Sequence, residues 1–255
     1  MQVVVLAKYV PEPQGVPKLG SDNRLVREGV EGALDPGDEY GLEAGLQLAQ
    51  AAGGEVTVVS MGPEVAMAAI RRALSMGADR GVLITDDTLC GADALATARV
   101  LAAAVRRQPF DLVIAGVEST DGSTGTLPMT VAELLGVPSA TFARHLEVVN
   151  GTLRIERQTE VGYDVLECEL PALVTLTAGA NQPRYPTLKG IMQAKQKPVD
   201  QLSLADLGLS AEDVAATQHI GSIESAAEKG PGEVLQAGDD APARVADLLA
   251  EAKVI

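Results

Sequence analysis

The sequence predicts an α/β fold built on a doubly wound parallel sheet. Between Gln2 and Leu135, four short apolar runs alternate with segments of helical spacing. Such alternation is typical of βαβ units whose strands are covered on both faces. The chain is also 46% apolar but only 2% aromatic, with no Trp. Its core therefore has to be built from Ala, Val, Leu and Ile, which suits helices packed on a sheet.

The alternating elements can be assigned in order along the chain. The expected strands are the apolar runs Gln2–Leu6, Val56–Ser60, Val82–Thr85 and Leu112–Ala115. The expected helices are Asp38–Ala52, a helix opened by Gly62-Pro63 that stops near Gly77, Asp93–Arg107 and Met129–Leu135. Most of them stop at glycines, which are favoured just past helix C-termini. Residues 11–30, which contain Pro, Gly and charges, are expected to form a long excursion.

The pattern changes after the fourth strand and its helix. Segments 145–149 and 153–160 flank Asn150-Gly151, the preferred pair for a type I′ turn, and predict an antiparallel hairpin. Val165–Glu169 and Ala172–Leu176 add strands, so we expect an added antiparallel hairpin sheet. We place a domain boundary between residues 1–199, the α/β domain, and residues 200–255. This last segment holds 11 Asp or Glu against 3 Lys or Arg. It is expected to be a loosely ordered tail or an arm that wraps a partner, with an amphipathic helix at about residues 243–252.

Composition and charge argue against several classes of protein. The formal net charge of -15 disfavours nucleic acid as a main partner, because phosphate contacts need Lys and Arg. Cys90 and Cys168 are not spaced like metal ligands and are interpreted as free thiols in a reducing compartment. The N-terminal apolar run is too short for a signal peptide, and no segment approaches the roughly 20 apolar residues of a membrane span. A cytoplasmic protein without a membrane span is expected.

No arrangement typical of a catalytic site is visible in the sequence. Paired carboxylates such as Asp86-Asp87 lie beside turn residues, where capping or solvation explains them. The two histidines, His145 and His219, are too few and too scattered for a His-based metal site. We therefore expect a protein whose chemistry belongs to a bound cofactor and not to its own side chains.

A loop dense in Gly, Ser and Thr follows the fourth strand and precedes a helix, over residues 116–127. In a doubly wound sheet, ligands bind beyond the carboxyl ends of the strands. Backbone N–H groups and hydroxyls at a helix N-terminus suit a phosphate. The loop lacks the Gly-Lys-Ser/Thr ending of a Walker loop, and no G-x-G-x-x-G follows the first strand. A phosphate site and an ordinary capped loop both remain open from this chemistry.

The segment 181–197, N-x-P-R-Y-P-x-L-x-x-I-M-x-A-K-x-K, has the most unusual composition in the chain. Prolines on both sides of Arg184 and Tyr185 stiffen the backbone and keep it out of a regular helix or central strand. A short helix-capable piece follows, with three lysines and no acid, in a chain that is otherwise strongly acidic. The segment is either a contact surface or a solvated loop leading into a surface helix.

This segment resembles the signature of the beta subunit of electron transfer flavoproteins, and the resemblance extends from about Val3 to Leu209. The loop over residues 116–127 is close to the S-T-D-G form of the bacterial type. The resemblance implies an adenine-nucleotide-hydrolase-like α/β fold and a heterodimer with an alpha subunit, which shares an FAD and supplies most of its site. It also implies an electron carrier, not an enzyme, between flavin dehydrogenases such as acyl-CoA dehydrogenases and a quinone oxidoreductase.

The resemblance further implies that this chain binds a structural AMP. Asp35 stands where the family often has Asn, and Met61 where it often has Cys; these changes are mild if the contacts are through backbone atoms. The implied nucleotide-binding residues are Leu6, Ala7, Asp35, Pro36, Gly37, Asp38, Met61, Gly116, Val117, Glu118, Ser119, Thr120, Asp121, Gly122, Ser123, Thr124, Gly125, Thr126 and Leu127.

In the family, the segment equivalent to 181–197 docks the carrier onto its dehydrogenases. Leu188 matches the leucine that fills an apolar pocket on the partner; the alternative is a Leu188 buried against its own domain. Gln158 stands where the family has a Glu that pairs with the alpha subunit, which puts that contact in doubt. The implied docking residues are Arg184, Tyr185, Leu188, Ile191, Met192 and Lys195.

Two other functions stay open. One is an electron-bifurcating subunit that binds a second FAD in place of AMP, and NADH; Asp121-Gly122-Ser123-Thr124 shares only part of the loop typical of that group. The other is a stand-alone adenine-nucleotide-binding or hydrolysing protein of related fold, which would have no use for segment 181–197.

Overall fold

The computed structural model describes residues 1–12, 18–27, 29–224, 234–236, 238 and 240–255. The chain divides into two compact units, Met1–His219 and Ile220–Ile255. The division falls later than the boundary expected after residue 199, because the strand Val199–Leu202 pairs within the main sheet and Leu204 and Val214 are buried in the core of the first unit.

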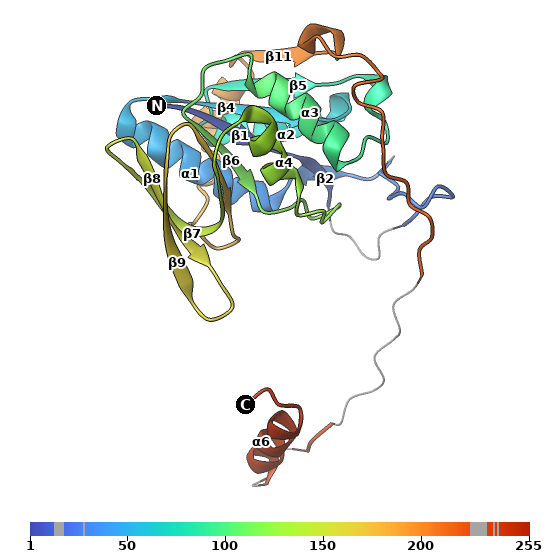
Figure 1. Cartoon of the computed structure of the whole chain (residues 1–255), viewed down its shortest axis with the longest axis vertical. Coiled ribbons are helices and arrows are strands. Elements are labelled where there is room, and N and C mark those ends of the chain that lie inside the picture. Colours follow the sequence, from blue (N-terminus) through green and yellow to red (C-terminus); the bar gives the residue numbers. More distant parts are fainter. Residues whose placement is uncertain (13–17, 28, 225–233, 237, 239) are drawn as a thin grey trace. The chain divides into compact units, whose positions relative to one another are not determined.

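The first unit is built on a nine-stranded sheet with the order β11-β5-β4-β1-β6-β10-β7-β8-β9 (Figure 1). The strands from β11 to β7 pair in parallel, so the predicted doubly wound parallel sheet is confirmed. The strands are β1 (Gln2–Leu6), β4 (Glu55–Met61), β5 (Arg80–Ile84), β6 (Leu112–Gly116), β7 (Ser139–Val149), β8 (Thr152–Gln158), β9 (Tyr163–Glu169), β10 (Ala172–Leu176) and β11 (Val199–Leu202).

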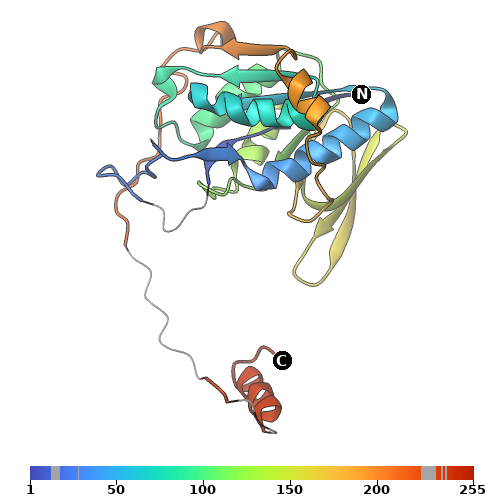
Figure 2. The same ribbon diagram turned by 180° about the vertical axis from the view of Figure 1, so that it is seen from behind.

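Helices cover both faces of the parallel part of the sheet. Figure 1 shows α3 and α4 on one face, and Figure 2 shows α1, α2 and α5 on the other. Alternate residues of β1 point to opposite faces of the sheet. Val3 and Val5 pack in the cluster that contains α1, whereas Val4 and Leu6 pack in the cluster that contains α3. The helices are α1 (Pro36–Ala52), α2 (Met67–Met76), α3 (Ala94–Val105), α4 (Leu127–Leu135) and α5 (Leu188–Ala194).

Helix α1 lies unusually close to the sheet because two glycines face it. A Cβ added at Gly45 would lie 3.2 Å from the side chains of both Val3 and Val5, and one at Gly41 would lie 3.2 Å from Ile114. The helix therefore approaches the centre of the sheet more closely than larger residues would allow. Its N-terminus is consequently held against the carboxyl ends of β1 and β6.

The expected antiparallel hairpin is present, and its strands extend the main sheet. Strand β7 begins beside β10 in parallel register, passes an irregularity between Ala143 and His145, and continues antiparallel to β8. Strand β9 then pairs with β8 along its whole length. The turn at Asn150-Gly151 has positive φ at both residues, as a type I′ turn requires.

Several short elements differ from the expected ones. The long excursion after β1 contains a small sheet of β2 (Tyr9–Pro11) and β3 (Gly32–Leu34), while its residues 13–17 and 28 lie outside the described part. The expected helix after Gly62-Pro63 starts as a 3-10 turn, η1 (Glu64–Ala66), before α2. Similar turns form at η2 (Asp87–Leu89) and η3 (Ala205–Leu207). Strand β7 begins at Ser139, ahead of the expected start at His145.

The second unit contains helix α6 (Ala241–Glu251), close to the helix expected at about residues 243–252. None of its described residues is buried, and Val245 and Leu249 are exposed. The expected arm also includes residues 225–233, 237 and 239, which lie outside the described residues. Among the described residues, no helix is both long and apolar enough to span a membrane.

Candidate functional site

The predicted nucleotide-binding residues meet at the topological switch point of the sheet. Strands β1 and β6 are neighbours, but β1 continues to β4 on one side and β6 continues to β10 on the other. Ligands of doubly wound sheets bind in the crevice beyond the carboxyl ends of two such strands. Here those ends lead into Ala7 and Lys8 after β1, and into the loop 116–127 after β6.

Asp35 joins the N-terminus of α1 to the loop after β6. One carboxylate oxygen accepts a hydrogen bond from the Gly37 backbone N–H at 2.9 Å and caps the helix. The other oxygen accepts from both the backbone N–H and the hydroxyl of Thr120, at 2.8 and 3.0 Å. Asp35 has no exposed surface. Its side chain therefore works as an internal cross-link that sets the position of the loop, and Pro36 forms the first turn of the helix beside it.

Asp121 ties the same loop to two cations from outside it. Its carboxylate accepts from Lys8 Nζ at 2.6 Å and from the Arg27 guanidinium at 2.7 and 3.0 Å. Burial would raise the pKa of Asp121, but the hydrogen bonds and charges of Lys8 and Arg27 hold that pKa below its ordinary value. Lys8 Nζ also donates to Ser119 Oγ at 3.2 Å. Two cations from outside the loop therefore surround the single carboxylate of Asp121.

Asp38 lies between the ends of the two central strands. Its carboxyl accepts a hydrogen bond from the Lys8 backbone N–H at 2.8 Å, and the Gly116 backbone also donates to it. A Cβ added at Gly116 would approach Asp38 Oδ1 to 2.8 Å, so this position has room only for glycine. Burial, followed by the charge of Asp35, raises the pKa of Asp38 to about 8.

The donors left over at this edge suit a phosphate-bearing ligand. Helix α4 starts at Leu127, and its N-cap Thr126 makes no side-chain capping bond, so the amides of its first turn need another acceptor. Ser123 and Gly125, just before the helix, both have positive φ. In the neighbouring strand β4, the buried hydroxyl of Ser60 has no hydrogen-bond partner among the described residues, and Met61 lies half-buried after it.

The predicted docking segment is fastened to α1 at its start. The Arg184 guanidinium forms a two-pronged ion pair with Glu43 at 2.7 and 2.9 Å, and the Arg184 backbone N–H adds a third bond at 3.1 Å. Asn181 Nδ2 donates to the Tyr40 carbonyl at 2.9 Å. The structure therefore directs Arg184 into its own domain, where it positions the segment and does not face outward.

The other end of the segment is fastened to α2. Lys197 Nζ donates to the carbonyls of Leu74 and Ala78 at 3.1 and 2.6 Å, which caps the C-terminus of α2. A Cβ added at Gly190 would lie 2.4 Å from the Ser75 carbonyl, so α5 packs directly on that helix end. Thr187 caps α5 by accepting from the Gly190 N–H at 3.0 Å.

Between these two fastenings, apolar side chains point into solvent. Tyr185 and Leu188 are each 84% exposed, Met192 is 73% exposed and Ile191 is 47% exposed. The alternative of a Leu188 buried against its own domain is therefore wrong. Lys195 is exposed on the last turn of the same piece, and Gln158 is exposed at the end of β8. A rigidly held backbone that exposes apolar side chains is typical of an interaction site.

The match to known proteins decides the family. A family model described as the electron transfer flavoprotein domain matches residues 22–207, which is more than half of the chain. The chain belongs to the electron transfer flavoprotein family. The resemblance drawn from segment 181–197 and the loop 116–127 is thereby confirmed, and electron transport by a flavoprotein is the activity of this family.

Relatives among curated proteins assign the chain to the beta subunits of electron transfer flavoproteins. The subunit beta of Thermoanaerobacterium thermosaccharolyticum is 39% identical over 206 residues, covering 81% of this chain and 79% of the relative. That of Mycobacterium bovis is 42% identical over 219 residues, covering 83% and 82%. A third relative, the caffeyl-CoA reductase-Etf complex subunit CarD of Acetobacterium woodii, is 37% identical over 244 residues, covering 92% of each chain.

Some residues of this electron transfer flavoprotein subunit escaped the sequence reasoning. Lys8 lies two residues after the first strand, and a cation at the carboxyl end of a strand is the signal that identifies it. The sequence around Arg27 and Glu43 does not indicate their roles. Arg27 lies in the irregular excursion, and Glu43 resembles any solvent-exposed acid of a helix. Both act across more than 90 residues of sequence separation, which only the fold reveals.

Proposed function

We propose that this chain is the beta subunit of a heterodimeric electron transfer flavoprotein that carries electrons from flavin dehydrogenases, such as acyl-CoA dehydrogenases, to a quinone oxidoreductase. The observation that carries this proposal is Leu188, 84% exposed on a segment anchored through Arg184 to the buried Glu43. A carrier that exchanges partners quickly needs a small apolar contact that is already in its binding conformation. We further propose that the heterodimer works in the cytoplasm.

The redox chemistry in this proposal belongs to FAD shared with an alpha subunit, and this chain is not itself an enzyme. FAD supplies the one- and two-electron steps when it is bound. This chain contributes docking through Tyr185, Leu188, Ile191, Met192 and Lys195, and we propose that residues 220–255 contact the alpha subunit. Arg184 acts in the same surface as a positioning residue.

We propose AMP as the ligand of the switch-point site. The amides of the first turn of α4 and the ammonium of Lys8 would hold its phosphate, with Ser119, Ser123 and Thr124 as hydroxyl donors. Asp35 and Asp38 would act from behind the site, by fixing the loop and the strand ends that line it. The AMP is structural in this proposal, because no catalytic pair lies beside the loop among the described residues.

The electron-bifurcating form, with a second FAD and an NADH site, is the alternative that a count of the bound nucleotides distinguishes from this proposal. The stand-alone nucleotide-binding protein is less favoured, because that function does not explain the exposed apolar side chains of segment 181–197.

The deciding experiment counts the nucleotides in the assembled protein. This chain is co-expressed with the alpha-like protein of the same organism, and the purified complex is denatured to release its ligands. About one FAD and one AMP per heterodimer is the expected result. Two FAD and no AMP would assign the chain to the bifurcating form, whereas a failure to form any flavin-containing complex would overturn the proposal.

A further inference from the structure

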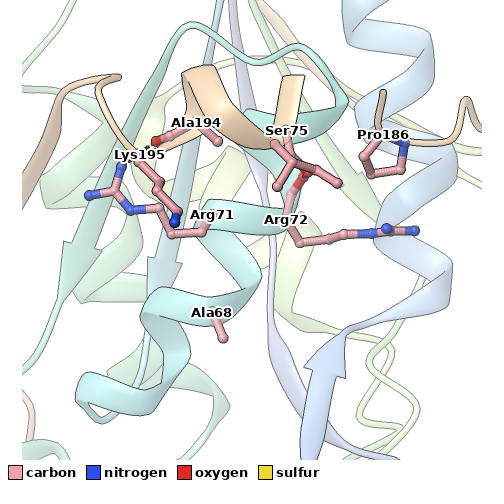
Figure 3. Close-up of a pocket in the computed structure, with 8 residues that line it drawn as sticks. Ala68, Arg71, Arg72, Ser75, Pro186, Ala194 and Lys195 are labelled. Carbon is pink, nitrogen blue, oxygen red and sulfur yellow. Dashed lines mark hydrogen bonds between the residues drawn. The ribbon is translucent and has the colours of Figure 1, made fainter. Parts of the chain in front are cut away.

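A hollow of about 600 Å³ lies between α2 and α5, and half of its lining residues belong to the segment 181–197 (Figure 3). Three of its lining residues are cations, and no acidic side chain lines it. The remainder are apolar or small. The lining residues are Ala68, Arg71, Arg72, Ser75, Pro186, Ile191, Ala194 and Lys195.

The cations of the hollow differ in how far their charge is balanced. Arg72 pairs with Glu39 at 3.2 Å and extends toward Pro186. Arg71 instead donates to two neutral acceptors, the carbonyls of Ala194 at 2.6 Å and Lys197 at 3.1 Å. Figure 3 shows the ends of Arg71 and Lys195 on the same side of the hollow. Among the described residues neither of them has an acidic partner, in a chain whose net charge is -15.

We propose that this hollow receives a carboxylate side chain of the donor dehydrogenase while Leu188 fills an apolar pocket on that enzyme. The inference rests on the proposed carrier function and adds the chemistry of the partner surface: an acidic side chain beside an apolar recess. Two neighbouring like charges without a counter-ion repel each other, and a partner carboxylate relieves that repulsion.

The geometry supports this occupant in two further ways. Arg71 is held in place by its two carbonyl bonds, so little side-chain freedom is lost when an anion arrives. Ile191 lines the hollow and also belongs to the exposed apolar patch, so the hollow and the patch form one continuous surface. A salt-sensitive rim around a small apolar contact favours fast association and fast release, as an electron carrier requires.

The test compares two charge reversals in the same segment, at Lys189 in α5 and at its C-cap residue Lys195. Lys195→Glu changes a residue that lines the hollow, whereas Lys189→Glu makes the same change in net charge at an exposed position that does not line it. Each variant is made in the purified heterodimer. The probe is the purified acyl-CoA dehydrogenase of the same organism, with butyryl-CoA as substrate, and the reduction of the heterodimer's flavin is followed at low and high ionic strength.

We expect Lys195→Glu to raise the KM for the heterodimer about tenfold at low ionic strength with kcat unchanged, and Lys189→Glu to change the KM by no more than about twofold. The difference should shrink at high salt. Leu188→Ala separates the two proposals. If Leu188→Ala raises the KM but the two charge reversals behave alike, the hollow is not the acidic subsite. If Leu188→Ala also has no effect, the docking function itself is overturned.

Discussion

Asp35 holds together two parts of the chain that are far apart in sequence, and its chemistry can be tested one bond at a time. In Asp35→Asn, the amide oxygen can still accept from Gly37 and cap α1. The amide nitrogen cannot accept from the Thr120 N–H, so the tie to the loop is lost. We expect the free energy of unfolding to fall by about 1–3 kcal/mol, the cost of a buried donor left unpaired.

The same variant should lose the proposed AMP ligand from the purified heterodimer more readily than the wild type, because the loop 116–127 is no longer fixed. Thr120→Val is the matched control for the hydroxyl alone, since it keeps the backbone bond to Asp35. Equal AMP retention after dialysis in Asp35→Asn and the wild type would show that the cross-link does not serve the nucleotide site.

Asp38 makes the stability of the fold depend on pH. Its pKa is raised from 3.8 to about 8 in the folded chain. Between those values the native state keeps a proton that the unfolded chain has released, so the free energy of unfolding falls as the pH rises from about 4 to about 8. Each pKa unit corresponds to about 1.4 kcal/mol. The stabilisation is present below pH 4 and lost above pH 8.

Asp38→Asn is expected to flatten this dependence, because an amide is neutral throughout. Urea unfolding of the isolated chain at several pH values between 5 and 9 measures it, and subtracting the variant's profile from the wild-type profile cancels the other titrating groups. Altered hydrogen bonding with Lys8 and Gly116 adds only a pH-independent offset to the difference between the two profiles. A difference that consists of this offset alone, with no change between pH 5 and pH 9, would show that the pKa of Asp38 is not raised in the folded chain.

At the scale of elements, the ion pair between Arg184 and Glu43 fixes the docking segment on α1. The Glu43 side chain is 5% exposed and that of Arg184 is 31% exposed. Burial would raise the pKa of Glu43, but its hydrogen bonds, above all with Arg184, keep that pKa below the ordinary value. Arg184→Ala leaves a buried carboxylate without its partner and is expected to destabilise the chain by about 3 kcal/mol.

The double variant Arg184→Ala with Glu43→Ala should be less destabilised than the sum of the two single variants. Hydrogen exchange of residues 181–194 should rise in Arg184→Ala while that of β1 and β6 stays unchanged. Additive effects of the two substitutions would show that the pair contributes no coupling energy, and that the segment is held by other contacts.

The elements that the sequence predicted correctly are those decided by local pattern. Strands β1, β4, β5, β6 and β10 are mostly apolar because both of their faces are buried, and such runs can be recognised without tertiary information. Strand β11 was not predicted, since Val199-Asp200-Gln201-Leu202 carries only two apolar residues and becomes a strand by pairing with β5. The beginning of β7 was not predicted for the same reason, because it becomes a strand by pairing with β10.

In the candidate site, too, local sequence patterns predict some features, and only the tertiary structure reveals the others. The loop 116–127 was recognisable because Gly, Ser and Thr cluster at a strand end, and the docking segment because its prolines and lysines are unusual. The bonds that hold these pieces, from Asp35 to Thr120 and from Glu43 to Arg184, join residues 85 and 141 positions apart. No local pattern carries such information, so the sequence places Arg184 among the docking residues and does not reveal its bond to Glu43.

At the scale of the whole molecule, we expect the first unit to determine the thermal stability of the isolated chain and the second to contribute to binding of the alpha subunit. The unit Met1–His219 holds the whole nine-stranded sheet, whereas none of the described residues of α6 is buried. A chain that ends at His219 should therefore unfold within about 2 °C of the full chain when each is studied alone. Calorimetry of both chains measures this.

In the heterodimer the outcome should be different, because the exposed apolar side chains of α6, among them Val245 and Leu249, suit a partner surface. We expect the shortened chain to bind the alpha subunit at least about tenfold more weakly and to retain less FAD. Equal affinity of the two chains for the alpha subunit, measured by titration calorimetry, would rule out the arm as part of that interface.

Helix α1 has Asp35 and Asp38 at its start and Glu43 further along. The spacing of these residues therefore sets the distance between the loop 116–127 and the segment 181–197. An α-helix advances about 1.5 Å and turns about 100° per residue. One residue inserted between Asp38 and Glu43 would leave the nucleotide side in place but swing Glu43 about a quarter-turn away from Arg184. We therefore expect the chain to tolerate changes in the length of the loops at either end of α1, but not in the number of residues from Asp35 to Glu43.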